Sequence, residues 1–135
     1  MKKIVLLAIK PYYAKKIKCA EKTVELRKVV PRVSKGDIVV LYETLPVQKV
    51  TAYCKVVEVI SMPPFQLWEQ AAEKECVSQE VFNQYFEGCE IANGLVLEGV
   101  VALKKEKGIQ EFRQGKHVPQ SYCYLSESEF EEILR

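Results

Sequence analysis

Apolar and polar residues alternate along this chain with two different periods, which predict strands and helices in turn. Lys3 to Ile9 is a nearly continuous apolar run, typical of a strand buried on both faces. Pro11 follows at a position that the first turn of a helix tolerates, so we expect a helix from about Tyr12 to Cys19. The alternation within Lys22–Lys28 then predicts a short strand.

The next third of the chain has the features of a turn followed by two strands. Residues Val33–Asp37 contain the Ser, Gly and Asp that turns favour. Strands are expected over Ile38–Tyr42 and Val50–Ile60. The alternation of the second strand slips near Val57, which indicates a β-bulge.

The middle of the chain changes to helical spacing after Pro63 and Pro64. One helical face is formed by Phe65, Leu67, Trp68, Ala71 and Ala72. A second helix is expected to begin at Ser78, whose hydroxyl can cap it, and to stop at Gly88. We expect the apolar residues of that helix to lie in the core; they are Val81, Phe82, Tyr85 and Phe86.

The final third returns to strands and closes with a helix. Ile91–Leu103 is strand-like, Lys104–Lys116 is charged and weakly patterned, and Tyr122–Leu125 predicts a last short strand. Ser126 and Glu129 form a capping box for a terminal helix. Strands at both ends with a helical insertion predict an α+β fold in one domain over residues 1–135, with enough strands for a small, partly closed β-barrel.

The overall charge says little about a partner. The chain has 20 basic and 18 acidic side chains, a formal net charge of +2. Basic residues gather in the first third and acidic ones after Ser121. A nucleic-acid partner must therefore be argued from local placement.

Cysteine usage and hydropathy suggest where the protein resides. The five cysteines are widely spread, and none has the pair spacing of zinc or redox motifs, so we expect structural, buried thiols. The N-terminus lacks the apolar segment of a secretion signal, and no stretch is long enough to span a bilayer. These features predict a reduced, cytoplasmic protein without a membrane partner.

The strand Lys22–Lys28 carries the most informative chemistry. If its apolar residues face the core, Thr23, Glu25 and Arg27 share the opposite face. Glu25 and Arg27 can then pair with each other, or divide the donor and acceptor edges of a ligand between them. The alternative is an exposed salt bridge of little energetic weight, with Lys22 solvated.

This strand and several other motifs resemble the ASCH domain of the PUA-like superfamily. The family motif Gly-x-Lys-x-x-Glu-x-Arg falls on Ala20, Lys22, Glu25 and Arg27, with only the glycine replaced. Further matches follow in order along the chain: Leu7–Pro11, Gly36-Asp37, Tyr42, Val50–Val59, Leu67-Trp68, Phe82–Gly88 and Pro119–Tyr122. The chain is similar to small stand-alone ASCH proteins described as transcriptional regulators.

The resemblance implies a barrel of about five or six strands with surrounding helices and a cleft along the Lys-Glu-Arg strand. It implies an RNA or nucleotide-like ligand, with a place in RNA metabolism or in the regulation of transcription or translation. Arg27 would bind phosphate or a base acceptor, Glu25 would accept from a base, and Lys22 would add charge. Further candidate contacts are Lys10, Gln120, Ser121, and Tyr42 or Tyr122 as stacking rings.

A hydrolase acting on a modified nucleoside or on RNA is the alternative function. One ASCH branch hydrolyses an acetyl amide on a modified cytidine with a lysine and a threonine. Lys22 matches that lysine, but Glu25 stands at the threonine position and Thr23 is displaced by two residues. For ribonuclease chemistry the single histidine, His117, precedes the Pro-Gln-Ser motif, although its setting is typical of an exposed loop residue.

Other chemistry lacks support in the sequence. Carboxylates such as Glu21, Glu25, Asp37 and Glu43 form no dedicated metal motif, and the common cofactor motifs are missing, so no metal or cofactor is expected. Trp68 is expected to pack the helical insertion on the barrel, with a lid over the cleft as the alternative. A regulatory module that binds other proteins would instead have an empty or closed cleft. The sequence does not predict an oligomeric state.

Overall fold

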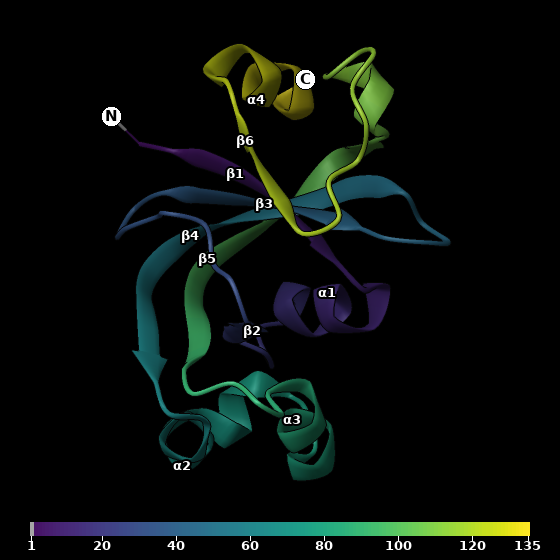
Figure 1. The fold of residues 1–135 in the computed structure, drawn as a ribbon. Helices are drawn as coiled ribbons and strands as arrows, with labels where there is room; N and C mark the ends of the chain where they lie inside the picture. Colours follow the sequence, from purple (N-terminus) through teal and green to yellow (C-terminus); the bar gives the residue numbers. More distant parts are fainter. Residues whose placement is uncertain (1) are drawn as a thin grey trace.

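Six strands form one strongly curled sheet in the computed structural model, which describes residues 2–135 (Figure 1). The strands are β1 (Ile4–Ile9), β2 (Val24–Arg27), β3 (Ile38–Glu43), β4 (Lys49–Met62), β5 (Ala92–Lys107) and β6 (Tyr122–Leu125). Their order in the sheet is β2-β5-β4-β3-β1-β6. The neighbours β1 and β3 are parallel, and every other pair in this order is antiparallel. The α+β half-barrel expected from the sequence is confirmed.

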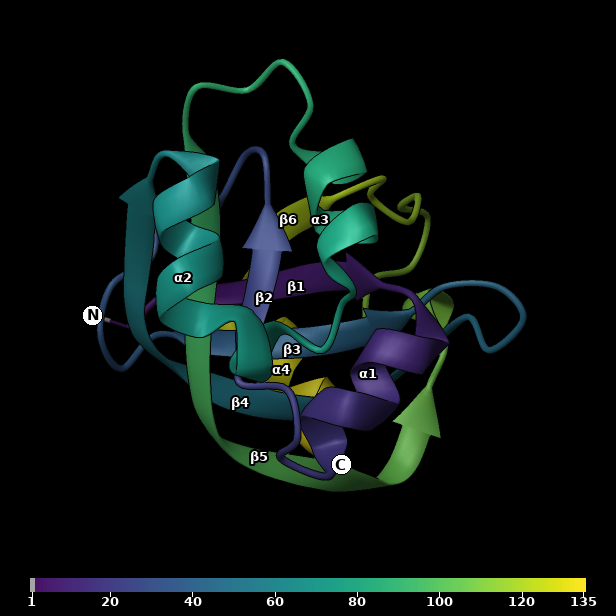
Figure 2. The same ribbon diagram turned by 90° about the horizontal axis from the view of Figure 1, so that it is seen from below.

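The helices lie on both sides of the curled sheet. They are α1 (Pro11–Lys18), α2 (Pro64–Glu75), α3 (Gln79–Tyr85) and α4 (Glu127–Leu134), with a 3-10 turn at Ile109–Glu111. The two helices inserted between β4 and β5, α2 and α3, lie together at one end of the molecule (Figures 1 and 2). The α4 helix lies on the opposite side of the sheet from α1 (Figure 1).

Local sequence signals account for most of these elements. The hydroxyl of Ser126 accepts a hydrogen bond from the backbone N–H of Glu129, and the Glu129 carboxylate accepts one in return, so the expected capping box is confirmed. Ser78 caps α3 as expected. The register between β4 and β5 shifts between Val56 and Glu58, which confirms the bulge predicted near Val57.

Three expectations about the elements need correction. Strand β5 continues to Lys107 rather than ending near Leu103, because its far end pairs with the start of β4. Two of the residues expected in the core of α3 are exposed, Val81 at 46% and Tyr85 at 37%, because no element packs over that side of this short helix. Of the five cysteines, only Cys54 is fully buried, and burial raises the pKa of its thiol to about 12.

The core fills both faces of the sheet and the space under α2 and α3. On β1, Leu7 and Ile9 face the cluster that includes Ala14 and Ile17 of α1, while Leu6 and Ala8 face the cluster beneath α4. Strand β1 is therefore buried on both faces, as its continuous apolar run predicts. A third cluster joins α2 and α3 to β2 and the start of β5, so the helical insertion has its own apolar contact with the barrel.

A turn with a left-handed residue ends α1 and leads the chain into β2. The N–H groups of Ala20 and Glu21 donate to the carbonyls of Ile17 and Lys16, the paired bonds of a Schellman motif. This motif requires a left-handed residue after the helix, and Ala20 has φ of 64°. The position where the ASCH motif has glycine is thus the one whose backbone favours glycine.

No helix within residues 2–135 is both long and apolar enough to cross a membrane.

Candidate functional site

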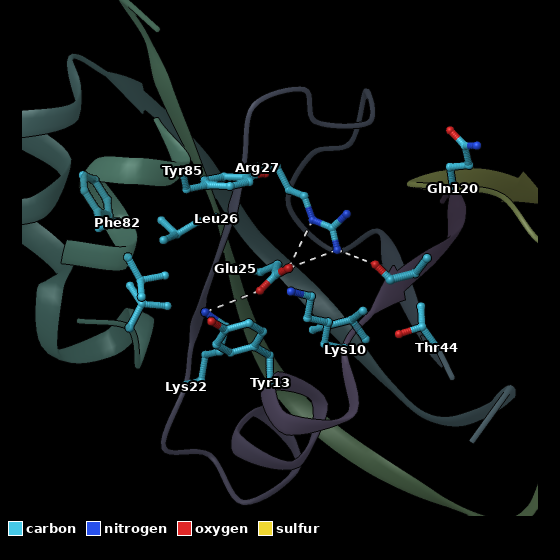
Figure 3. A pocket seen from close by; sticks show the side chains of 14 residues that line it. Lys10, Tyr13, Lys22, Glu25, Leu26, Arg27, Thr44, Phe82, Tyr85 and Gln120 are labelled. Atoms are coloured by element: carbon cyan, nitrogen blue, oxygen red, sulfur yellow. Dashed lines mark hydrogen bonds and ion pairs between the residues drawn. The ribbon is translucent and has the colours of Figure 1, made fainter. Parts of the chain in front are cut away.

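A pocket of about 380 Å³ opens between α1, β2, α3 and the end of β1 (Figure 3). Fourteen residues line it: Ala8, Ile9, Lys10, Tyr13, Lys22, Glu25, Leu26, Arg27, Thr44, Val77, Val81, Phe82, Tyr85 and Gln120. The cleft expected along the Lys-Glu-Arg strand therefore exists, and it is open rather than closed by side chains.

A row of alternating charges runs along the floor of this pocket. One carboxylate oxygen of Glu25 lies 3.4 Å from Lys22 Nζ. The other accepts a hydrogen bond from Arg27 Nε at 3.1 Å and forms an ion pair with Arg27 Nη2 at 3.0 Å. Glu25 thus holds two cations in fixed positions, and both of its oxygens are engaged (Figure 3).

Lys22 is a buried cation rather than a solvated one. The residue is only 2% exposed, and its ammonium donates to the backbone carbonyls of Val24, at 2.8 Å, and Glu75. It also lies 5.2 Å from the ring centre of Tyr13. Burial lowers the pKa of Lys22, and the attraction of Glu25 opposes that effect. The interpretation of Lys22 as an exposed side chain is therefore wrong.

Arg27 connects β2 to the other side of the open barrel. Its Nη2 donates to the carbonyl of Ala8 at 2.6 Å, and its Nη1 lies 3.4 Å from the Ser121 hydroxyl. Backbone contacts place these partners, because the N–H of Ala8 donates to the carbonyl of Ser121. Arg27 therefore bridges β2 with β1 and the segment that leads into β6.

The remaining pocket walls divide into a polar side and an apolar side. The polar side has Lys10, Thr44 and Gln120, and Figure 3 shows the Lys10 side chain extending into the pocket. Thr44 is held there because its N–H donates to the carbonyl of Ile9, at the end of β1. Facing them are the apolar and aromatic side chains of β2, α3 and the segment before α3, which are Leu26, Val77, Val81, Phe82 and Tyr85.

Two further groups that sequence reasoning missed lie beside the charged row. Tyr13 projects from α1 into the pocket, and burial together with Glu25 raises its pKa, which keeps the phenol protonated as a donor. Glu75, at the end of α2, is fully buried, and neither of its carboxylate oxygens has a hydrogen-bond partner. Burial raises the pKa of Glu75 to about 7. The helical pattern of α2 does not predict that Glu75 is buried.

The sequence-based candidates divide into two groups by position. Lys10, Lys22, Glu25, Arg27 and Gln120 line the pocket. The other four do not line it. Thr23 lines a small separate cavity, and Ser121 contacts Arg27 from outside the pocket. Tyr42 is 3% exposed in the core cluster beneath α4, and Tyr122 packs against the cluster beneath α1. Tyr42 cannot stack on a ligand from its buried position. Thr23 does not share the pocket with Glu25.

The two single-copy residues also lie outside the pocket. His117 is exposed in the loop before Pro119, as its setting predicts. Trp68 packs against Phe82 with ring centres 5.2 Å apart, so it supports the helical insertion as expected and forms no lid. Within residues 2–135, no three His, Cys, Asp or Glu side chains lie close enough together to hold a metal ion.

The curled six-stranded half-barrel with a helical insertion is a PUA-like fold, and the charged cleft lies in it. The chain belongs to the ASCH domain family, whose model matches residues 7–132.

The chain is also similar to individual proteins in sequence or in fold. An ASCH domain-containing ribonuclease of Zymomonas mobilis is 24% identical over 98% of this chain and 91% of its own length. The crystal structure of ASCH from Zymomonas mobilis has a TM-score of 0.91 at 24% identity, over 97% of this chain and 93% of that one. Human THYN1, solved in complex with DNA containing 5-methylcytosine, has a TM-score of 0.55 at 13% identity, over 98% and 96% of the two chains.

Proposed function

We propose that the pocket binds one nucleotide unit, either within an RNA strand or as a free nucleotide-like ligand. The observation that carries this proposal is the two-sided lining. Three cations, Lys10, Lys22 and Arg27, accompany a single carboxylate, Glu25, on the floor and polar side. The opposite side is apolar and aromatic, with Tyr85 and Phe82.

These two sides match the two chemical parts of a nucleotide. A phosphate is favoured near Lys10 and Arg27, since excess positive charge in a partly enclosed site attracts anions. A base is favoured against Tyr85 and Leu26, because any base can stack on an aromatic or apolar surface. Glu25 acts mainly by orienting Lys22 and Arg27, since both of its oxygens already bind these cations.

Similar proteins agree with this class of ligand. One relative is named a ribonuclease, and a protein with the same fold was solved with DNA. A nucleotide pocket in this chain would fit a protein of RNA metabolism or of transcription or translation regulation.

Binding of fluorescent single-stranded and duplex RNA, followed by anisotropy at low and physiological salt, tests the proposal. Lys10→Gln removes a charge from the pocket, and we expect it to weaken binding and to reduce the salt dependence. Lys15→Gln is the matched control, because Lys15 is exposed on α1, the helix that follows Lys10, and does not line the pocket. Arg27→Ala should abolish binding. Equal affinities of Lys10→Gln and Lys15→Gln for every RNA would refute a phosphate site in this pocket.

Hydrolysis in the same pocket is the second candidate, and one observation favours it. Lys22 lines the pocket 3.4 Å from the Glu25 carboxylate, and burial lowers its pKa, as is common for proton-transfer groups. Thr23 is not a suitable nucleophile for this reaction, since it lies outside the pocket. The RNA recovered from the binding assay is therefore sized. Shortened RNA from the wild type, with intact RNA still bound by Glu25→Gln, would indicate a hydrolase; intact RNA and lost binding would indicate a binding module.

A further inference from the structure

We infer that a single-stranded RNA does not end at the pocket but continues along the outer edge of β6, over a surface formed by Lys3, Arg32, Tyr122 and Tyr124. We call these four residues the β6 edge surface. This inference rests on the proposed function, because it extends the nucleotide pocket into a track for a strand.

The first argument is continuity with the pocket. Gln120 lines the pocket, β6 begins two residues later at Tyr122, and strand alternation places Tyr122 and Tyr124 on one side of β6. From Gln120 to Tyr124 is four residues, or about 13 Å of extended chain. A single nucleotide in the pocket does not cover that distance, whereas a longer strand does. Strand β6 is last in the sheet and pairs only with β1, so its outer edge is open in the described part of the chain.

The second argument is the exposed aromatic ring at the end of this path. Tyr124 is 44% exposed, and its ring lies edge-on to Tyr122 with centres 6.0 Å apart. Its hydroxyl accepts a hydrogen bond from the backbone N–H of Arg32 at 2.9 Å. The ring is thus held in place while its surface stays open, which suits stacking with a base.

The third argument is the way in which the cations beside this ring are held. The backbone of Arg32 is fixed on both sides: its N–H binds Tyr124, and its carbonyl accepts from Lys3 Nζ at 2.8 Å. The Arg32 side chain is exposed, and within residues 2–135 neither Arg32 nor Lys3 belongs to an ion pair. The charge of Lys3 is partly offset by the Asp37 carboxylate, which accepts a hydrogen bond from the Lys3 backbone N–H at 3.0 Å, whereas the exposed Arg32 contributes a full charge. An exposed cation beside an exposed aromatic ring is typical of surfaces that bind single-stranded nucleic acid.

The surface has a natural limit at its far end. The acidic helix α4 begins at Glu127, three residues after Tyr124, and its carboxylates repel a phosphate backbone. A strand that leaves the pocket is therefore favoured as far as Tyr124 and Arg32 and disfavoured beyond them. The proposed track is short, and its effect should depend on the length of the RNA.

The test compares a long and a short probe on the same variants. Affinities are measured for fluorescein-labelled octauridylate by anisotropy and for uridine monophosphate by competition. We expect Tyr124→Leu to weaken octauridylate binding at least about fivefold through lost stacking. We expect Arg32→Gln to reduce the slope of log affinity against log salt by about 0.7. Neither change should alter the affinity for uridine monophosphate.

A charge-matched control is Lys104→Gln. Lys104 is an exposed residue of β5, which β4, β3 and β1 separate from β6 in the sheet. This variant should bind both probes like the wild type, and circular dichroism melting verifies that all variants are folded.

The outcomes separate this inference from the proposed function. If Tyr124→Leu and Arg32→Gln bind octauridylate within twofold of the wild type, the track is refuted while the pocket proposal stands. Equal losses for octauridylate and uridine monophosphate would also overturn the track, because Tyr124 or Arg32 would then act through the pocket. If the wild type binds neither probe, the proposed function fails and the track fails with it.

Discussion

Replacing Glu25 by Gln tests whether the charged row in the pocket is a coupled buried unit. The change removes the carboxylate that faces both Lys22, at 3.4 Å, and Arg27, at 3.0 Å. Removing one member of a buried ion pair commonly costs about 3–5 kcal/mol, because it leaves an uncompensated charge. Lys22 keeps two backbone carbonyls and Arg27 keeps the carbonyl of Ala8. We therefore expect the lower end, a loss of about 3 kcal/mol in the free energy of unfolding.

Urea denaturation measures this loss, with the fluorescence of the single tryptophan, Trp68, as the probe. Because the slope of stability against urea is about 1–3 kcal/mol per molar for small proteins, the midpoint should fall by about 1–3 M. Glu21→Gln is the matched control, since Glu21 pairs with Lys16 at 2.9 Å on the surface. That pair is open to solvent and screened, so its loss should leave the midpoint close to that of the wild type.

The reasoning is refuted if Glu25→Gln and Glu21→Gln shift the midpoint by the same small amount. Water in the pocket would then solvate Lys22 and Arg27 as well as Glu25 does. A second refuting result is a Glu25→Gln protein of wild-type stability whose RNA affinity is also unchanged, because Glu25 would then neither stabilise the fold nor orient the cations.

Three further predictions concern backbone and protonation. Ala20→Gly should raise the free energy of unfolding by about 0.5–1 kcal/mol in urea melts. Glycine relieves the strain of the left-handed backbone at position 20, and this gain exceeds the cost of the added entropy of the unfolded chain. An unchanged or lowered midpoint would contradict this prediction. Burial raises the pKa of Glu75 from 4.5 to about 7, so the stability that the buried neutral acid provides is complete below about pH 4.5 and is lost as the pH rises through about 7. Stability curves of wild type and Glu75→Gln should therefore diverge by about 3 kcal/mol over that range, and parallel curves would show that Glu75 titrates normally. Gly94→Ala should cost about 1–3 kcal/mol in the same melts, because the added methyl would lie 2.9 Å from a methyl of Val24; Gly108→Ala, which meets nothing closer than 3.9 Å, is the control and should change little.

The order and type of the elements could be predicted from the sequence because each depends on local chemistry. The capping box at Ser126 and the bulge near Val57 are set by residues a few positions apart. The continuous apolar run of β1 predicts its burial on both faces. The far part of β5 was missed because strand pairing, rather than apolar alternation, extends it to Lys107.

The candidate site was predicted only in its local part. Lys22, Glu25 and Arg27 occupy one short segment, so strand geometry and the family motif were enough to group them. That segment does not show which of these side chains is solvated, because the carbonyl of Glu75 that binds the buried Lys22 ammonium is 53 residues away in the sequence. The same holds for Ser121, 94 residues from the guanidinium that it contacts.

The sequence by itself therefore determined the strand that carries the charges, the elements around it and the family to which the chain belongs. Only the tertiary structure decided that Glu25 is shared between two cations, that Thr44 and α3 complete the pocket, and that Tyr42 and Thr23 lie outside it. The physical reason is that periodicity sets which face a side chain takes, whereas burial and pairing depend on what packs against that face from distant parts of the chain.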